Sequence, residues 1–132
     1  PMAKISNDVL ARVELFSDLD KKELEQIGSM MREHSYEAGR EVVTEGKEGL
    51  GFFIIAEGRA TVTIEGGEVR TLGPGDYFGE IALMRKSKRT ATVTAAGPLT
   101  CWSLTAWDFR PLVESNGSIG WKLLQAVAGR VD

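Results

Sequence analysis

Short strand-like runs separated by glycine-bearing turns fill the middle of the chain, from residue 34 to residue 104. The runs are HSYEA, EVVTE, FFIIAE, ATVTIE, EVRTL, DYF, TATVTAA and LTCWSL. Most of them are rich in β-branched or aromatic residues, and turn sequences such as EGKEGLG, EGR and GPGD lie between them. About eight short strands at this spacing are typical of a closed antiparallel architecture. We therefore expect an eight-stranded antiparallel β-roll (jelly roll) or a barrel over residues 34–104.

Helical periodicity precedes these strands. Asp20 and Glu23 have the spacing of a capping box, and the apolar residues after them recur at helical intervals: Leu24, Ile27, Met30 and Met31. This pattern predicts an amphipathic helix of about 13 residues. A shorter helix is expected before it, over residues 6–13, so that residues 5–33 form a helical lead-in.

Helical periodicity also returns after Thr105. Trp107, Leu112 and Val113 predict one helix, and a second apolar series predicts another: Ile119, Trp121, Leu124, Val127 and Val131. The apolar face of this last helix should rest on the roll or on a second copy of the chain, so it is a candidate homodimer interface. The predicted fold class is thus mainly β with flanking helices, as one domain over residues 1–132 with C-terminal helices at 105–131.

Composition limits the partners of this domain. The chain has 132 residues, 42% of them hydrophobic and 27% charged, which suits one globular domain. Its formal net charge of -3 argues against a nucleic-acid or acidic-membrane surface. No apolar stretch approaches the roughly 18 residues that span a bilayer. Cys101 is the single cysteine and has no partner for an internal disulfide, which favours a cytoplasmic setting.

The segment FGEIALMRKSKRTATV, residues 78–93, interrupts the strand pattern. Helix-compatible residues follow Gly79, so we expect a short helix whose first N–H groups and positive dipole end can hold an anion. Glu80 at this helix start would repel a bare phosphate unless a sugar hydroxyl donates to it. Arg89 lies nine residues on and can present its planar fork to phosphate oxygens, with Thr90 adding donors. The pattern implies an anion together with a sugar.

Each of these residues also has a simpler explanation. Glu80 taken alone could merely favour a helix N-terminus, and Arg89 could be a solvated loop residue. The basic residues Arg85, Lys86 and Lys88 are expected to form a solvated face with at most a screened steering role. His34 is expected on the surface or at a strand edge, and Cys101 as a buried small apolar residue. With one histidine, the chain offers no metal site of several histidines and a carboxylate, which argues against a metal-dependent cupin enzyme.

FGEIALMRKSKRTA resembles the phosphate-binding cassette of cyclic nucleotide-binding domains. The pattern of that cassette is F-G-E-(I/L)-A-L, four or five variable residues, then R-(S/T/A)-A, and every fixed position matches. The resemblance extends over nearly the whole chain. LFSDLDKKELEQI looks like the helical lead-in of the family, EGKEGLGFFIIAEGRATV like its glycine-framed hairpin, and DFRPLVESNGSIGWKLLQAVAGRV like its two closing helices.

The resemblance implies a role for each residue of the cassette, residues 78–91. Glu80 would accept from the ribose 2′-hydroxyl, Arg89 would pair with the cyclic phosphate, and N–H groups around Gly79, Ile81, Ala82 and Thr90 would complete the cradle. The full predicted ligand-binding set is Phe78, Gly79, Glu80, Ile81, Ala82, Arg89, Thr90 and Ala91.

Residues that would contact the base carry less signal. The resemblance suggests Val62, Ile64, Leu72 and Trp121, and core packing explains the first three of these residues equally well. Family members with Ser or Thr at the position of Thr90 bind the adenine nucleotide, although its hydroxyl could also accept from the guanine 2-amino group. Cyclic AMP (cAMP) is therefore the expected ligand, preferred over cyclic GMP (cGMP).

The expected function is that of a regulatory module rather than an enzyme. No nucleophile with a base, and no paired acid and base, is visible in the sequence, and no cofactor or metal is expected beyond the nucleotide ligand. Binding of a 3′,5′-cyclic nucleotide would shift the C-terminal helices and act on an effector domain or partner protein outside this chain. The alternative is a degenerate domain that keeps the fold as a structural or interaction module.

Overall fold

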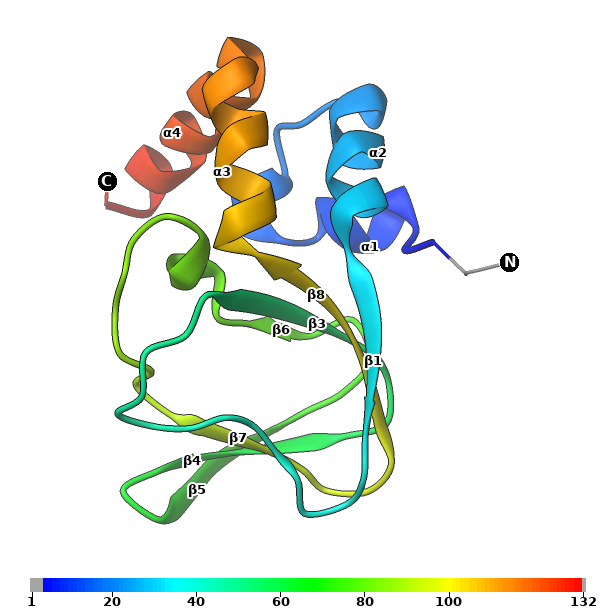
Figure 1. The fold of residues 1–132 in the computed structure, drawn as a ribbon, viewed down its shortest axis with the longest axis vertical. Helices are drawn as coiled ribbons and strands as arrows, with labels where there is room; N and C mark the ends of the chain where they lie inside the picture. The colour runs from blue at the N-terminus through cyan, green and yellow to red at the C-terminus, as the bar shows by residue number, and fades with distance from the viewer. Residues whose placement is uncertain (1–3, 132) are drawn as a thin grey trace. The chain divides into compact units, whose positions relative to one another are not determined.

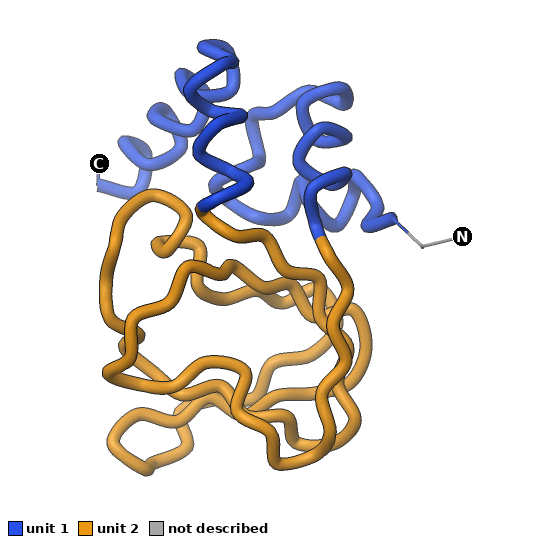
Figure 2. The backbone as a smooth tube through the Cα atoms, in the orientation of Figure 1, with its two compact units in different colours: residues 1–31, 107–132 blue, residues 32–106 orange. Residues whose placement is uncertain are grey.

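The computed structural model describes residues 4–131 and divides into two compact units. The first unit contains the chain up to residue 31 and from residue 107, and the second contains residues 32–106 (Figure 2). The outer bounds of the predicted domain, residues 1 and 132, lie outside the described residues. No helix within residues 4–131 is long and apolar enough to cross a membrane.

The second unit consists of two four-stranded antiparallel sheets (Figure 1). One sheet has the order β1 (Arg32–Tyr36), β8 (Leu99–Thr105), β3 (Gly51–Glu57), β6 (Tyr77–Phe78). The other has the order β2 (Glu41–Val43), β7 (Thr92–Ala95), β4 (Ala60–Ile64), β5 (Gly67–Leu72). Every strand pair is antiparallel. The predicted eight-stranded antiparallel roll with flanking helices is confirmed.

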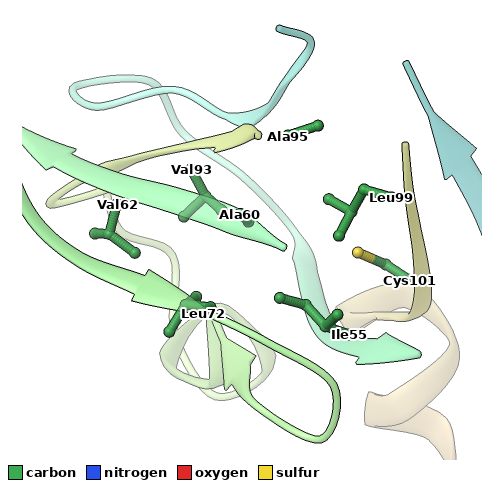
Figure 3. Close-up of a cluster of buried hydrophobic side chains, with 8 residues drawn as sticks. All are labelled: Ile55, Ala60, Val62, Leu72, Val93, Ala95, Leu99 and Cys101. Atoms are coloured by element: carbon green, nitrogen blue, oxygen red, sulfur yellow. The ribbon is translucent and has the colours of Figure 1, made fainter. Parts of the chain in front are cut away.

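Side chains from both sheets fill the interior of the roll (Figure 3). The buried cluster consists of Ile55, Ala60, Val62, Leu72, Val93, Ala95, Leu99 and Cys101. Ile55, Leu99 and Cys101 come from the first sheet and the other five from the second. Burial raises the pKa of the Cys101 thiol to about 12, so this cysteine is a small core residue, as predicted.

The N-terminal segment forms three short helices: α1 (Asn7–Ala11), the 3₁₀ helix η1 (Glu14–Phe16) and α2 (Lys21–Met30). The predicted capping box is present, because Asp20 Oδ1 accepts from the Glu23 N–H and the Asp20 N–H donates to Glu23 Oε1, both at 2.9 Å. The helix has 10 residues rather than about 13. Met31 already has extended backbone and Arg32 pairs with Ser103, so the chain leaves the helix at this point and joins the sheet.

The C-terminal segment forms α3 (Ala106–Ser115) and α4 (Gly117–Val131). The predicted apolar series of the last helix contains both buried and exposed residues. Ile119 and Leu123 are buried, whereas Trp121, Leu124 and Val131 are 62%, 58% and 85% exposed. Periodicity alone did not fix the rotation of this helix, because ion pairs with other helices of the unit also orient it.

Glu23 is the centre of the polar contacts that orient α4. Its carboxylate is buried, and it accepts from the Ser118 hydroxyl at 2.9 Å and from Lys122 Nζ at 2.6 Å, besides the capping N–H of Asp20. Burial raises the pKa of Glu23, but these hydrogen bonds outweigh it and the pKa lies below the ordinary value of 4.5. The capping-box glutamate of α2 thereby also contacts α4.

The lowered pKa of Glu23 predicts a pH-dependent stability. Its contribution to the free energy of unfolding is complete above the unfolded pKa and is lost as the pH falls through the lower folded pKa. Glu23→Gln should therefore unfold at lower urea concentration than the wild type at pH 7, and the difference should shrink by pH 3. Glu25→Gln, on the exposed side of the same helix, is the control. It should leave the midpoint of urea unfolding unchanged at both pH 7 and pH 3. A difference that stays constant from pH 7 to pH 3 would contradict the assignment.

Candidate functional site

The predicted short helix is a single 3₁₀ turn, η2 (Glu80–Leu83), directly after β6. Gly79 caps it in the left-handed conformation, with φ 84° and ψ 15°. A Cβ at Gly79 would lie 2.8 Å from the carbonyl oxygen of Gly51, so both the conformation and the space require glycine. The first N–H groups of such a turn have no acceptor inside it.

The predicted cradle residues differ in their surroundings. Glu80 is half-buried in the first turn, where it adds a negative charge. Ile81 is 51% exposed, whereas Ala82 is buried and its N–H donates to the Gly79 carbonyl at 3.1 Å. The turn itself therefore already engages the Ala82 N–H.

The loop after η2 leads to β7 (Figure 1). Arg89 belongs to this loop. Arg89 Nη2 donates to the Gly51 carbonyl oxygen at 2.7 Å. The guanidinium is half-buried, and this burial lowers its pKa from the ordinary value of 12.5. Arginine stays charged at neutral pH even so. Arg89 forms no ion pair with any carboxylate of residues 4–131.

The remaining cassette residues divide between surface and core. Thr90 is exposed. Phe78 stacks on Phe53, with ring centroids 5.1 Å apart and planes at 17°, and both rings pack against the interior cluster. Ala91 packs against the same cluster. Phe78 and Ala91 thus attach the two ends of the cassette to the roll.

The candidate base contacts differ in their surroundings. Val62 and Leu72 lie in the interior cluster (Figure 3), whereas Ile64, at the end of β4, is 43% exposed. Trp121 belongs to α4 in the other compact unit. The sequence offered core packing as the alternative to base contact for the strand residues. Val62 and Leu72 have the surroundings that core packing predicts.

The other singled-out residues lie where the sequence predicts them. His34 is exposed on β1, an edge strand. Arg85, Lys86 and Lys88 are exposed, and Lys86 Nζ lies 3.5 Å from Glu48 in a solvated ion pair. Such a pair contributes little to stability.

Sequence reasoning missed the loop of residues 44–51. The Gly46 N–H donates to the Arg89 carbonyl and the Arg89 N–H donates to the Lys47 carbonyl, both at 2.8 Å, while the Gly51 carbonyl receives the guanidinium. Three glycines within six residues, at 46, 49 and 51, were the available signal, and they indicated only a turn. Contacts across 38 to 43 residues of sequence leave no local pattern.

The arrangement suits an anion with a neighbouring hydroxyl. A half-buried guanidinium without a carboxylate partner among the described residues can give its remaining donors to anionic oxygens. The start of η2 at Gly79 adds backbone N–H groups, and Glu80 adds a carboxylate. No step in this chemistry makes or breaks a covalent bond.

Three comparisons place this chain among known proteins. It is 35% identical over 99 residues to the cAMP-dependent protein kinase regulatory subunit of Yarrowia lipolytica, which covers 75% of this chain but only 26% of that protein. The N-terminal domain of a Streptomyces coelicolor transcriptional regulator has a TM-score of 0.85 and 29% identity, covering 94% of this chain and 92% of that one. The regulatory domain of Toxoplasma gondii PKA, crystallised with cAMP, has a TM-score of 0.71 and 34% identity, covering 80% and 42%.

The sequence profile of one family covers most of the roll and the helix after it. That profile describes the cyclic nucleotide-binding domain, and it matches residues 33–116, including the whole cassette of residues 78–91. Together with the confirmed roll, this match means that the chain belongs to the cyclic nucleotide-binding domain family.

Proposed function

We propose that this chain is a regulatory module that binds a 3′,5′-cyclic nucleotide, with cAMP preferred over cGMP, at the cassette of residues 78–91. The observation that carries the proposal is the half-buried Arg89 guanidinium, which a backbone carbonyl holds in place and no carboxylate of residues 4–131 neutralises. A buried cation is costly without a counter-ion, and a cyclic phosphate would provide one.

Each cassette residue has a proposed role. Arg89 pairs with the phosphate and Glu80 accepts from the ribose 2′-hydroxyl. The proposed cradle consists of Phe78, Gly79, Ile81, Ala82, Thr90 and Ala91, and the proposed base contacts are Val62, Ile64, Leu72 and Trp121. The proximity of Gly79, Gly51 and Arg89 supports this assignment, because it brings the helix start and the guanidinium to the same place.

The preference for cAMP is supported by the relatives. The Yarrowia protein is the regulatory subunit of a cAMP-dependent protein kinase, and the Toxoplasma domain was crystallised with cAMP. We also propose that the module is cytoplasmic, catalyses no reaction and does not itself bind nucleic acid. Its effector lies outside this chain, and the relatives illustrate two kinds of effector: a protein kinase and a transcriptional regulator.

We further propose that α4 relays ligand occupancy and is the contact for a homodimer. Trp121, Leu124 and Val131 are exposed large apolar side chains on this one helix. This apolar face can be exposed, or it can be covered by a partner or another segment. A ligand that contacts these two states differently shifts the equilibrium between them.

Ligand linkage tests binding itself. Millimolar cAMP over a micromolar Kd should stabilise the fold by about 4 kcal/mol, because only the folded state binds. Differential scanning calorimetry across a cAMP titration measures this gain as a rising Tm. A Tm that stays flat with both cAMP and cGMP would leave the degenerate structural domain as the function.

The roles of Arg89 and Glu80 predict different failures. Arg89→Ala should cost about 2 to 5 kcal/mol of binding, or roughly 30-fold to several thousand-fold in affinity, because it removes a charged partner in a partly desolvated site. Arg89→Lys should restore only part of the lost affinity, since an ammonium group cannot reproduce the planar pair of donors of a guanidinium. Glu80→Ala should cost less, on the order of 1 to 3 kcal/mol.

The 2′-deoxy analogue of cAMP separates these two roles in isothermal titration calorimetry. Wild type should discriminate strongly against it, Glu80→Ala should scarcely discriminate, and Arg89→Ala should weaken both ligands while keeping their ratio. Glu80→Ala protein that still rejects the deoxy analogue would show that the 2′-hydroxyl is recognised elsewhere.

Tryptophan fluorescence tests the relay. If cAMP changes the environment of α4, the emission of wild type should shift on binding, and Trp121→Phe should abolish the shift. Trp107→Phe is the matched control, because Trp107 is 75% exposed on the preceding helix, and it should keep the shift. A homodimer contact on α4 should also make the Trp121 emission depend on protein concentration. An undiminished shift in Trp121→Phe would make α4 a passive element.

A further inference from the structure

The residues that hold Arg89 come from one loop. Its N–H and carbonyl groups bond to Lys47 and Gly46, and its guanidinium bonds to Gly51 at the end of the same loop. The backbone bridge between Glu48 and Lys88 adds a further link. The main chain and the guanidinium of Arg89 are thus both hydrogen-bonded to residues 46–51. The conformation of this loop therefore decides where the guanidinium lies.

Two glycines leave the guanidinium its space. A Cβ at Gly49 would overlap Nε and Nη2 of Arg89 and lie 2.7 Å from Cζ, and a Cβ at Gly79 would lie 2.6 Å from Nη1. Real Cβ atoms essentially never approach other heavy atoms this closely. Gly46, in the same loop, has nothing within 4 Å of its Cβ position, so the close approach is not shared by every glycine of this loop.

Gly49 and Gly79 differ in what else requires glycine. Gly79 has φ +84°, and a Cβ there would also meet the backbone oxygen of Gly51. Gly49 lies outside the left-handed region, and the three atoms nearest to its Cβ position all belong to the Arg89 guanidinium. A side chain at Gly49 would therefore conflict first with the flexible end of Arg89, whereas a side chain at Gly79 would also conflict with the backbone.

We propose that Gly49 is a positioning residue for the ligand site, whose missing side chain lets the Arg89 guanidinium lie against the loop and bond to the Gly51 carbonyl. This inference rests on the proposed function, because Arg89 is there the phosphate partner. Gly49 is proposed to act by positioning Arg89 rather than by contacting the ligand. Displacing the fork would misalign its donors, and aligned paired donors are what distinguish arginine from a simple cation.

The test combines affinity with unliganded stability. Gly49→Ala should lower the affinity for cAMP in isothermal titration calorimetry by about tenfold or more, the size expected when one charge-assisted hydrogen bond is misaligned. Its Tm without ligand should equal that of wild type. Gly97→Ala is the matched control, because Gly97 has ordinary φ and nothing within 4 Å of its Cβ position, and it should change neither quantity.

A second variant covers the case in which Gly49→Ala also lowers the Tm. In Arg89→Ala protein the overlapping atoms are gone, so adding Gly49→Ala should then leave the Tm of Arg89→Ala unchanged. A further fall in the double variant would show that the loop backbone, not the guanidinium, requires glycine, and would overturn the proposal.

The outcomes also separate this inference from the proposed function. If Arg89→Ala weakens cAMP binding while Gly49→Ala binds as wild type does, Gly49 has no positioning role and the proposed function stands. If Arg89→Ala itself binds as wild type does, the phosphate assignment fails and takes this inference with it.

Discussion

Burial of apolar side chains between the two sheets is the constraint on which the candidate site depends. Strand register cannot slip by one residue without turning the interior side chains outward, so this cluster fixes which residues pair. The pairing of Phe53 with Phe78 then brings the start of β3 beside the end of β6. Gly51 and Gly79 meet for this reason, although 28 positions separate them in the numbering. The core of the roll thereby positions the backbone of the candidate site, although few core side chains belong to that site.

Arg89 is the residue in which the structural and functional demands meet. Its main chain closes the loop of residues 44–51 onto the roll, and its guanidinium is partly removed from water with a carbonyl as its hydrogen-bond partner. A neutral carbonyl offsets the desolvation of a cation only in part. An incoming anion therefore gains more from this guanidinium than from one already paired with a carboxylate. The glycines around it supply the space that such an arrangement needs.

Polar contacts of Glu23 hold helices α2 and α4 of the helical unit together. The buried Glu23 carboxylate belongs to the capping box of α2 and also accepts hydrogen bonds from Ser118 and Lys122 of α4, so it links the two helices. Leaving a buried carboxylate without these partners would be costly, and the rotation of α4 follows from them. The same rotation leaves Trp121 and Leu124 exposed. An apolar surface kept on the helix proposed to relay occupancy is consistent with a regulatory module.

The sequence by itself determined the architecture and the family. Glycine-separated runs predicted all eight strands, Asp20 and Glu23 predicted the capping box, and residues 78–91 identified the family, because each of these signals lies within a few neighbouring residues. Tertiary structure alone decided three things: that α2 ends at Met30, that α4 buries Ile119 and Leu123, and that Gly49 and Gly51 surround Arg89. Each depends on contacts between residues far apart in the chain, and local periodicity and spacing carry no information about such contacts.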